Sequence, residues 1–126
     1  MQIGELARRT GVSRRSLRYY EQQRLLHARR GPNGWRDYDE TTVDRVRLIA
    51  EMISDGLTLD HVKQLTPCLD KQDSSECNDP ELPLQAYRAQ LAVLDERLAQ
   101  LQRRRGQLTQ KIELLQRANE QAEPLH

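Results

Sequence analysis

The sequence contains no phenylalanine, and its aromatic side chains are limited to four Tyr and one Trp besides the histidines. Hydrophobic residues make up 37% of the 126 residues, whereas charged residues make up 31%. This composition is thin material for a single globular core, so it favours an elongated molecule or an oligomer. The length allows one domain, or a small domain with a long appendage.

Long hydrophobic runs, a cysteine framework and enzyme motifs are also missing. No apolar run approaches the roughly 18 residues of a membrane span, and MQIGELARR lacks the apolar segment of a signal peptide. We therefore expect no membrane contact and a cytoplasmic location, where the two cysteines, Cys68 and Cys77, would be reduced by default. The sequence shows no carboxylate pair, nucleophile with a base, phosphate loop or HExxH motif, so we do not expect an enzyme.

The net charge of +1 conceals an asymmetry along the chain. Residues 1–36 contain nine Arg and two Glu, a net charge of +7, and the remaining residues carry a net charge of −6. A basic N-terminal segment on an otherwise acidic chain predicts a polyanionic partner that is approached from one side.

The first 23 residues have the spacing of a helix-turn-helix. A short helix is predicted over 3–9; Gly11 can take the left-handed conformation that ends it, and Ser13 is a good N-cap for a second helix with Leu17 facing inward. In a helix-turn-helix the second helix enters the major groove of DNA. An ordinary helical hairpin is disfavoured because the exposed positions of the second helix are basic and aromatic, namely Arg14, Arg15, Arg18 and Tyr19.

Residues 25–38, LLHARRGPNGWRDY, break the helical period. Pro32-Asn33-Gly34 is a strong turn signal and predicts a small β-hairpin, or wing. Basic and aromatic residues on both sides of the turn suit contact with phosphate and packing against sugar.

Two further helices are predicted to complete the N-terminal core. The first covers about 41–54 and stops at Gly56, and its apolar stripe consists of Val43, Val46, Ile49, Ala50 and Ile53. The second covers about 59–66 with Thr58 as its cap, and it turns Leu59, Val62 and Leu65 inward.

The C-terminal half is predicted to be one long helix. We expect a DNA-binding domain over 1–66, a polar linker over 67–81, a helix over 82–119 and a disordered tail over 120–126. The helix carries a heptad seam formed by Leu84, Tyr87, Leu91, Leu94, Leu98, Leu101, Leu108, Ile112 and Leu115, interrupted by Arg105. A helix of ~37 residues is ~55 Å long, too long to bury its stripe on a small domain, so a second copy of the chain is the economical partner.

The order of these elements resembles the MerR family of bacterial transcription regulators. The resemblance rests on IGELARRTGVSRRSLRYYEQQRLL, NGWRDYD, DGLTLDHVKQL and the terminal coiled coil. It implies a mostly α-helical fold: a winged helix-turn-helix domain, then a long helix forming an antiparallel coiled-coil homodimer. It also implies binding to a near-palindromic operator between widely spaced promoter elements, with activation or repression of RNA polymerase by bending and untwisting the DNA.

By similarity, the DNA-binding residues lie on the second helix and the wing. Arg14, Arg15, Ser16 and Arg18, with the cap Ser13, would lie at the groove, and Tyr19 and Tyr20 would contact the DNA backbone or brace the helix. From the wing, Arg30, Arg36 and Tyr38 would hold phosphates, beside the tip residues Asn33, Gly34 and Trp35.

The effector is left open by the sequence. Metal sensors of the family use a Cys near the start of the dimerization helix and two Cys after it; Cys77 is near the first place, but the tail ANEQAEPLH has none. Cys68 and Cys77 are therefore unremarkable thiols, a redox pair that forms a disulfide, or part of a metal site with His61 or Asp79. Acidic neighbours argue against fast thiolate chemistry, namely Asp70, Asp73, Glu76 and Asp79. A coiled-coil adaptor or anti-activator that binds protein is the alternative to a DNA-binding regulator.

Overall fold

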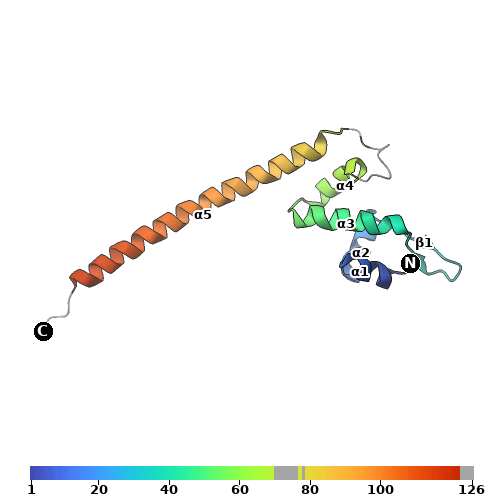
Figure 1. Cartoon of the computed structure of the whole chain (residues 1–126), viewed down its shortest axis with the longest axis horizontal. Helices are drawn as coiled ribbons and strands as arrows, with labels where there is room; N and C mark the ends of the chain where they lie inside the picture. The colour runs from blue at the N-terminus through green and yellow to red at the C-terminus, as the bar shows by residue number, and fades with distance from the viewer. Residues whose placement is uncertain (70–76, 78, 123–126) are drawn as a thin grey trace. The chain divides into compact units, whose positions relative to one another are not determined.

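The computed structural model describes residues 1–69, 77 and 79–122 (Figure 1). The chain separates into two compact units, Met1–Tyr87 and Arg88–His126. The elements along the chain are α1 (Ile3–Thr10), α2 (Arg14–Gln22), β1 (Arg29–Arg30), β2 (Arg36–Asp37), α3 (Glu40–Ser54), α4 (Leu59–Leu69) and α5 (Leu82–Gln121). The predicted fold class, mostly helical with a small two-stranded wing and a long C-terminal helix, is confirmed.

The turn between α1 and α2 forms as its sequence predicts. Gly11 has a φ of +73°, and its N–H donates to the carbonyl of Ala7 at 2.9 Å, which ends α1. The Ser13 hydroxyl accepts from the N–H of Ser16 at 3.1 Å and caps α2. Leu6 of α1 and Leu17 of α2 are fully buried in the same core.

The core of the first unit lies where α1, α2, α3 and α4 meet. On α3 the predicted positions Val43, Val46 and Ile49 are buried, but the prediction for Ile53 is wrong, since 39% of it is exposed. Met52 is fully buried instead. After α3 the chain turns through Gly56, which has a φ of +89°, and α4 packs against α3.

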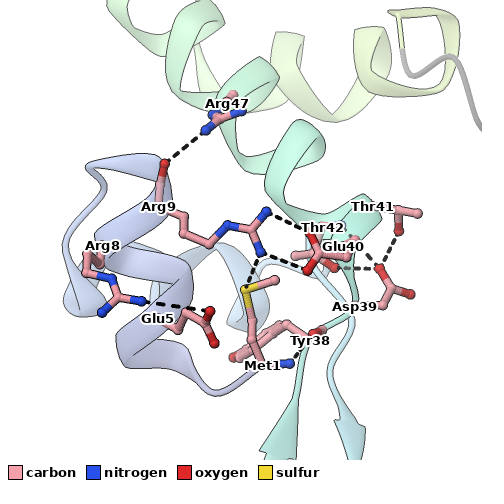
Figure 2. Close-up of polar contacts among 10 residues, drawn as sticks. All are labelled: Met1, Glu5, Arg8, Arg9, Tyr38, Asp39, Glu40, Thr41, Thr42 and Arg47. Carbon is pink, nitrogen blue, oxygen red and sulfur yellow. Dashed lines mark hydrogen bonds and ion pairs between the residues drawn. The ribbon is translucent and has the colours of Figure 1, made fainter.

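Polar contacts join the end of α1 to the start of α3 (Figure 2). Both terminal nitrogens of Arg9 donate to the carboxylate of Glu40, at 2.8 and 2.6 Å. Arg47 donates to the main-chain carbonyl of Arg9 at 3.0 Å, which satisfies an oxygen at the C-terminal end of α1. This bidentate ion pair and the carbonyl contact set the orientation of α1 on α3 more than they stabilise it, because the pair is exposed.

The first residues of α5 belong to the N-terminal unit. Ala86 is buried in its core, and the Tyr87 hydroxyl donates to Asp55 at 3.0 Å. Burial, and then the hydrogen bond to Asp55, raise the pKa of Tyr87 to about 12. Tyr87, predicted as a seam residue, thus also fastens α5 to the end of α3.

Beyond Tyr87 the predicted seam of α5 is open to solvent. Its apolar side chains are between 43% and 64% exposed, namely Leu91, Leu94, Leu98, Leu101, Leu108, Ile112 and Leu115. Among the described residues, no helix is both long and apolar enough to cross a membrane.

The helices α4 and α5 end later than predicted. α4 continues through Pro67 to Leu69, and α5 continues to Gln121. Within the predicted linker at 67–81, residues 70–76 and 78 lie outside the described residues, and so do residues 123–126 of the predicted tail at 120–126.

The same substitution at two glycines should have opposite effects on stability. Gly11→Ala should cost about 1–2 kcal/mol, because alanine resists the left-handed conformation at a φ of +73°. Gly106→Ala should stabilise α5 by about 1 kcal/mol, because Gly106 lies inside a helix with open space around the added methyl group. Urea unfolding of both variants, followed by circular dichroism, measures the two shifts. Shifts of the same sign would contradict this account of the Gly11 turn.

Candidate nucleic-acid interface

The face of α2 that points away from the core is basic. Leu17 and Tyr20 are buried, whereas Arg14, Arg15, Arg18 and Tyr19 are exposed, and Tyr19 retains 47% of its surface. The alternation follows the helical period, so one stripe holds the helix in place and the other is free for a partner.

Ser13 and Ser16 lie at the N-terminal end of this helix. Besides the cap, the Ser13 hydroxyl donates to the Ser16 hydroxyl at 3.0 Å. Both side chains are therefore engaged in holding the first turn of α2, and contacts of these serines with DNA stay a prediction.

The wing is a very short hairpin. Arg29 of β1 pairs with Asp37 of β2, and Arg30 pairs with Arg36. Between the strands, the N–H of Gly34 donates to the carbonyl of Gly31 at 2.9 Å across Pro32-Asn33, as in a type I turn. Trp35, which follows this turn, is 62% exposed.

The wing carries its charge at a cost to its own stability. Arg30 and Arg36 are directly opposite each other, and like charges in that position destabilise a strand pair. Arg30 donates to the carbonyl of Gly34 at 3.1 Å, which directs it along the hairpin tip. A pair of opposed guanidinium groups is explained more readily by a polyanionic partner than by the fold.

The position of Tyr38 corrects its predicted role. Tyr38 is fully buried, and its hydroxyl donates to Glu21 at 2.9 Å. The pKa of Tyr38 is raised to about 12, mainly by burial and secondly by this hydrogen bond. We therefore exclude Tyr38 from the proposed DNA surface, because its ring packs in the core. Tyr20 is also buried, which raises its pKa and agrees with bracing of the helix rather than with contact to DNA.

Glu21 is a residue of this region that the sequence interpretation did not single out. One oxygen accepts from Tyr38, and the other lies 3.3 Å from the Nε of Arg36 in the wing. A hollow of about 210 Å³ beside it is lined by Arg18, Glu21, Gln22 and Arg36. The only available signal in the sequence was an acidic residue at the end of the basic helix.

Taken together, these residues form a surface suited to a polyanion. Guanidinium groups bind phosphate or guanine edges in bidentate fashion, and exposed aromatic rings can pack on sugars. The first unit presents such groups from α2 and the wing, namely Arg14, Arg15, Arg18, Tyr19, Arg30, Trp35 and Arg36.

Cys68 and Cys77 are joined by a disulfide bond. The bond links the last turn of α4 to the segment just before α5. In this state neither sulfur can bind a metal as a thiolate, and the described residues contain no group of three metal-binding side chains. With this bond formed, the donor set of the described residues does not fit a metal ion.

A helix-turn-helix followed by a basic hairpin defines a winged helix-turn-helix DNA-binding domain. The sequence matches the profile of the MerR HTH family regulatory protein over residues 1–67 and that of the MerR DNA-binding region over residues 43–111. The chain belongs to the MerR family.

Among curated proteins, the chain is similar to the mercuric resistance operon regulatory protein of Bacillus cereus. The two are 38% identical over 78 residues, which cover 61% of this chain and 58% of that protein. The matched region thus spans less than two thirds of the length of that relative.

Two solved structures resemble the whole chain. PbrR691 from Ralstonia metallidurans CH34, in complex with lead(II), has a TM-score of 0.54 at 25% identity, with 100% of this chain and 90% of that chain covered. HiNmlR, a MerR family regulator lacking the sensor domain and bound to promoter DNA, has a TM-score of 0.58 at 21% identity, with 98% and 91% covered. The second likeness supports the fold alone.

Replacement of Arg18 by alanine should weaken DNA binding strongly. If Arg18 contacts a base edge or a phosphate, its loss should reduce affinity for the duplex upstream of the gene by about tenfold or more at ~150 mM salt. A gel shift measures this loss. The control is Arg117→Ala, which removes the same charge from the exposed surface of α5 and should leave affinity within about twofold. Equal binding by the parent and the Arg18→Ala variant would show that α2 is not the reading helix.

Proposed function

We propose that this protein is a sequence-specific transcription regulator that binds a near-palindromic promoter operator as a homodimer. The single observation that carries the proposal is the basic face on α2 and the wing, built on a helix-turn-helix of the MerR family. A protein-binding adaptor would not need opposed arginines such as Arg30 and Arg36 in its wing.

The exposed seam of α5 supports the homodimer. The seam continues for more than three heptads beyond Tyr87 on a helix of 40 residues. A stripe of this length on one helix requires a partner helix, and the same stripe on a second copy is complementary to it. Two copies then carry two α2 helices, which matches the two halves of a palindrome.

Deformation of DNA follows as the mode of action. Several phosphate contacts from each copy provide free energy for bending or untwisting a promoter, which costs on the order of 1 to 6 kcal/mol. A regulator that holds promoter elements in or out of register can activate or repress RNA polymerase without contacting it.

We further propose that the effector acts through Cys68 and Cys77 as a thiol–disulfide pair. Two details place the pair next to the start of α5: the Sγ of Cys68 lies 3.5 Å from the carbonyl of Asp79, and that carbonyl accepts from the N–H of Leu82, the first residue of the helix. Formation or loss of the bond therefore alters how α4 is connected to α5. In a reducing compartment such a bond forms only when an oxidant is present.

In this proposal a hydroperoxide oxidises the two thiols to the disulfide. One thiolate attacks the peroxide and the O–O bond breaks: that cysteine becomes a sulfenic acid, and the other oxygen takes up a proton and leaves as an alcohol or water. The second thiol displaces water from the sulfenic acid, so the two sulfurs lose two electrons and two protons in total.

Transcription in vitro tests both parts of the proposal. Output from the promoter upstream of the gene should differ by about fivefold or more between reduced and peroxide-treated protein, and intact mass should show the loss of two hydrogen atoms. The Cys77→Ser variant should bind the same DNA without responding to peroxide. An additional set of reactions supplies zinc, mercury(II) or lead(II) to the reduced protein.

The outcomes separate the two parts. No effect of the protein on transcription would contradict the regulator. An effect that is independent of peroxide would contradict the redox pair, and a response to metal alone would replace the disulfide by a thiolate metal site.

A further inference from the structure

Contacts within the wing are too few to fix its orientation. Each strand contains two residues, all four are exposed, and one of its two residue pairs opposes Arg30 to Arg36. A two-stranded hairpin of this kind is marginally stable by itself. Its orientation relative to α2 must therefore come from contacts outside the hairpin.

Glu21 provides contacts of this kind from the last turn of α2. Its two carboxylate oxygens contact different residues. One accepts from the Tyr38 hydroxyl at 2.9 Å, just after β2, and the other lies 3.3 Å from the Nε of Arg36 in β2. The Glu21 side chain is only 22% exposed, and Tyr38 is fully buried, so the tie is anchored in the core.

Glu21 contacts the Arg36 guanidinium through its Nε, at 3.3 Å. Arg36 lines the same hollow as Arg18, Gln22 and Glu21 itself. Two guanidinium groups at one hollow, one from the helix and one from the wing, match the donor arrangement that binds a phosphate group.

We propose that Glu21 is a positioning residue that fixes the wing against α2, so that Arg18 and Arg36 grip one phosphate of the DNA backbone together. The role rests on the proposed DNA-binding function. Glu21 itself does not contact DNA, because its carboxylate is committed to Tyr38 and Arg36.

A simple electrostatic role predicts the opposite result on mutation. Removal of a carboxylate near the binding surface should raise affinity for every DNA sequence, since phosphates repel it. Positioning instead predicts weaker binding, because the shared phosphate contact is lost. Since a phosphate contact carries no sequence information, binding to the operator and to unrelated DNA should both weaken. The sign of the effect therefore separates the two roles.

The experiment measures affinity for a duplex from upstream of the gene and for a scrambled duplex of equal length. Glu21→Ala should weaken binding to both duplexes, by about tenfold for each, because the lost contact is to a backbone phosphate. Glu21→Gln, which keeps an oxygen for the Tyr38 hydroxyl and loses the ion pair, should fall between the parent and Glu21→Ala. The control is Glu5→Gln, which removes a carboxylate whose ion pair with Arg8 lies on the surface of α1, and it should match the parent.

A double-variant cycle tests the coupling between Glu21 and Arg36. Arg36→Ala should weaken binding at least fivefold in the parent but less than twofold in the Glu21→Ala variant, because the arginine has then already lost its position. If Glu21→Ala fails to fold by circular dichroism, the same cycle with Glu21→Gln decides.

Each result has one meaning. Tighter or unchanged operator binding by the Glu21 variants, or equal effects of Arg36→Ala in both backgrounds, would overturn the positioning role while the parent still selects its operator. A parent protein that does not distinguish the two duplexes would overturn the proposed function, and with it the role of Glu21.

Discussion

The exposed apolar seam of α5 is the constraint on which the rest of the structure depends. A single chain cannot bury side chains such as Leu98 and Leu101, which are each 56% exposed, along a helix of this length. Each apolar side chain that is buried against a partner helix contributes roughly 1.5–3 kcal/mol at most, so a seam of seven residues readily stabilises a dimer. In the proposed dimer two copies share one helix pair, so the spacing of the two α2 helices would be set by the protein rather than by the DNA.

The N-terminal unit uses a small core to present charge. Leu6, Leu17 and Tyr38 are fully buried, whereas Arg18, which follows Leu17 in the sequence, is exposed. The connections between its elements are polar and specific, as between Arg9 and Glu40 or between Glu21 and Arg36. Surface ion pairs contribute little free energy, so their importance here lies in fixing orientation. The Cys68–Cys77 bond joins the last turn of α4 to the segment just before α5.

Much of the fold could be predicted because local chemistry determines it. The turn at Gly11, the cap at Ser13 and the wing turn each depend on a few neighbouring residues, and the seam depends on a simple period. Contacts between distant segments could not be predicted: Ile53 was assigned to the core instead of Met52, and Tyr38 to the DNA surface, because helix packing decides which side of a stripe is covered. Glu21 was missed because its partners, Arg36 and Tyr38, are 15 and 17 positions away in the sequence.

Hydroxyl-radical footprinting on the promoter upstream of the gene tests the central claim most directly. A dimer that carries two basic α2 helices and two wings should protect two segments related by a dyad, separated by an unprotected centre. The boundaries of the two segments should be the same for every protein concentration that gives protection, because both halves are occupied by one dimer. A single protected segment, or two segments that fill at different concentrations, would contradict an obligate pairing of two reading helices through α5.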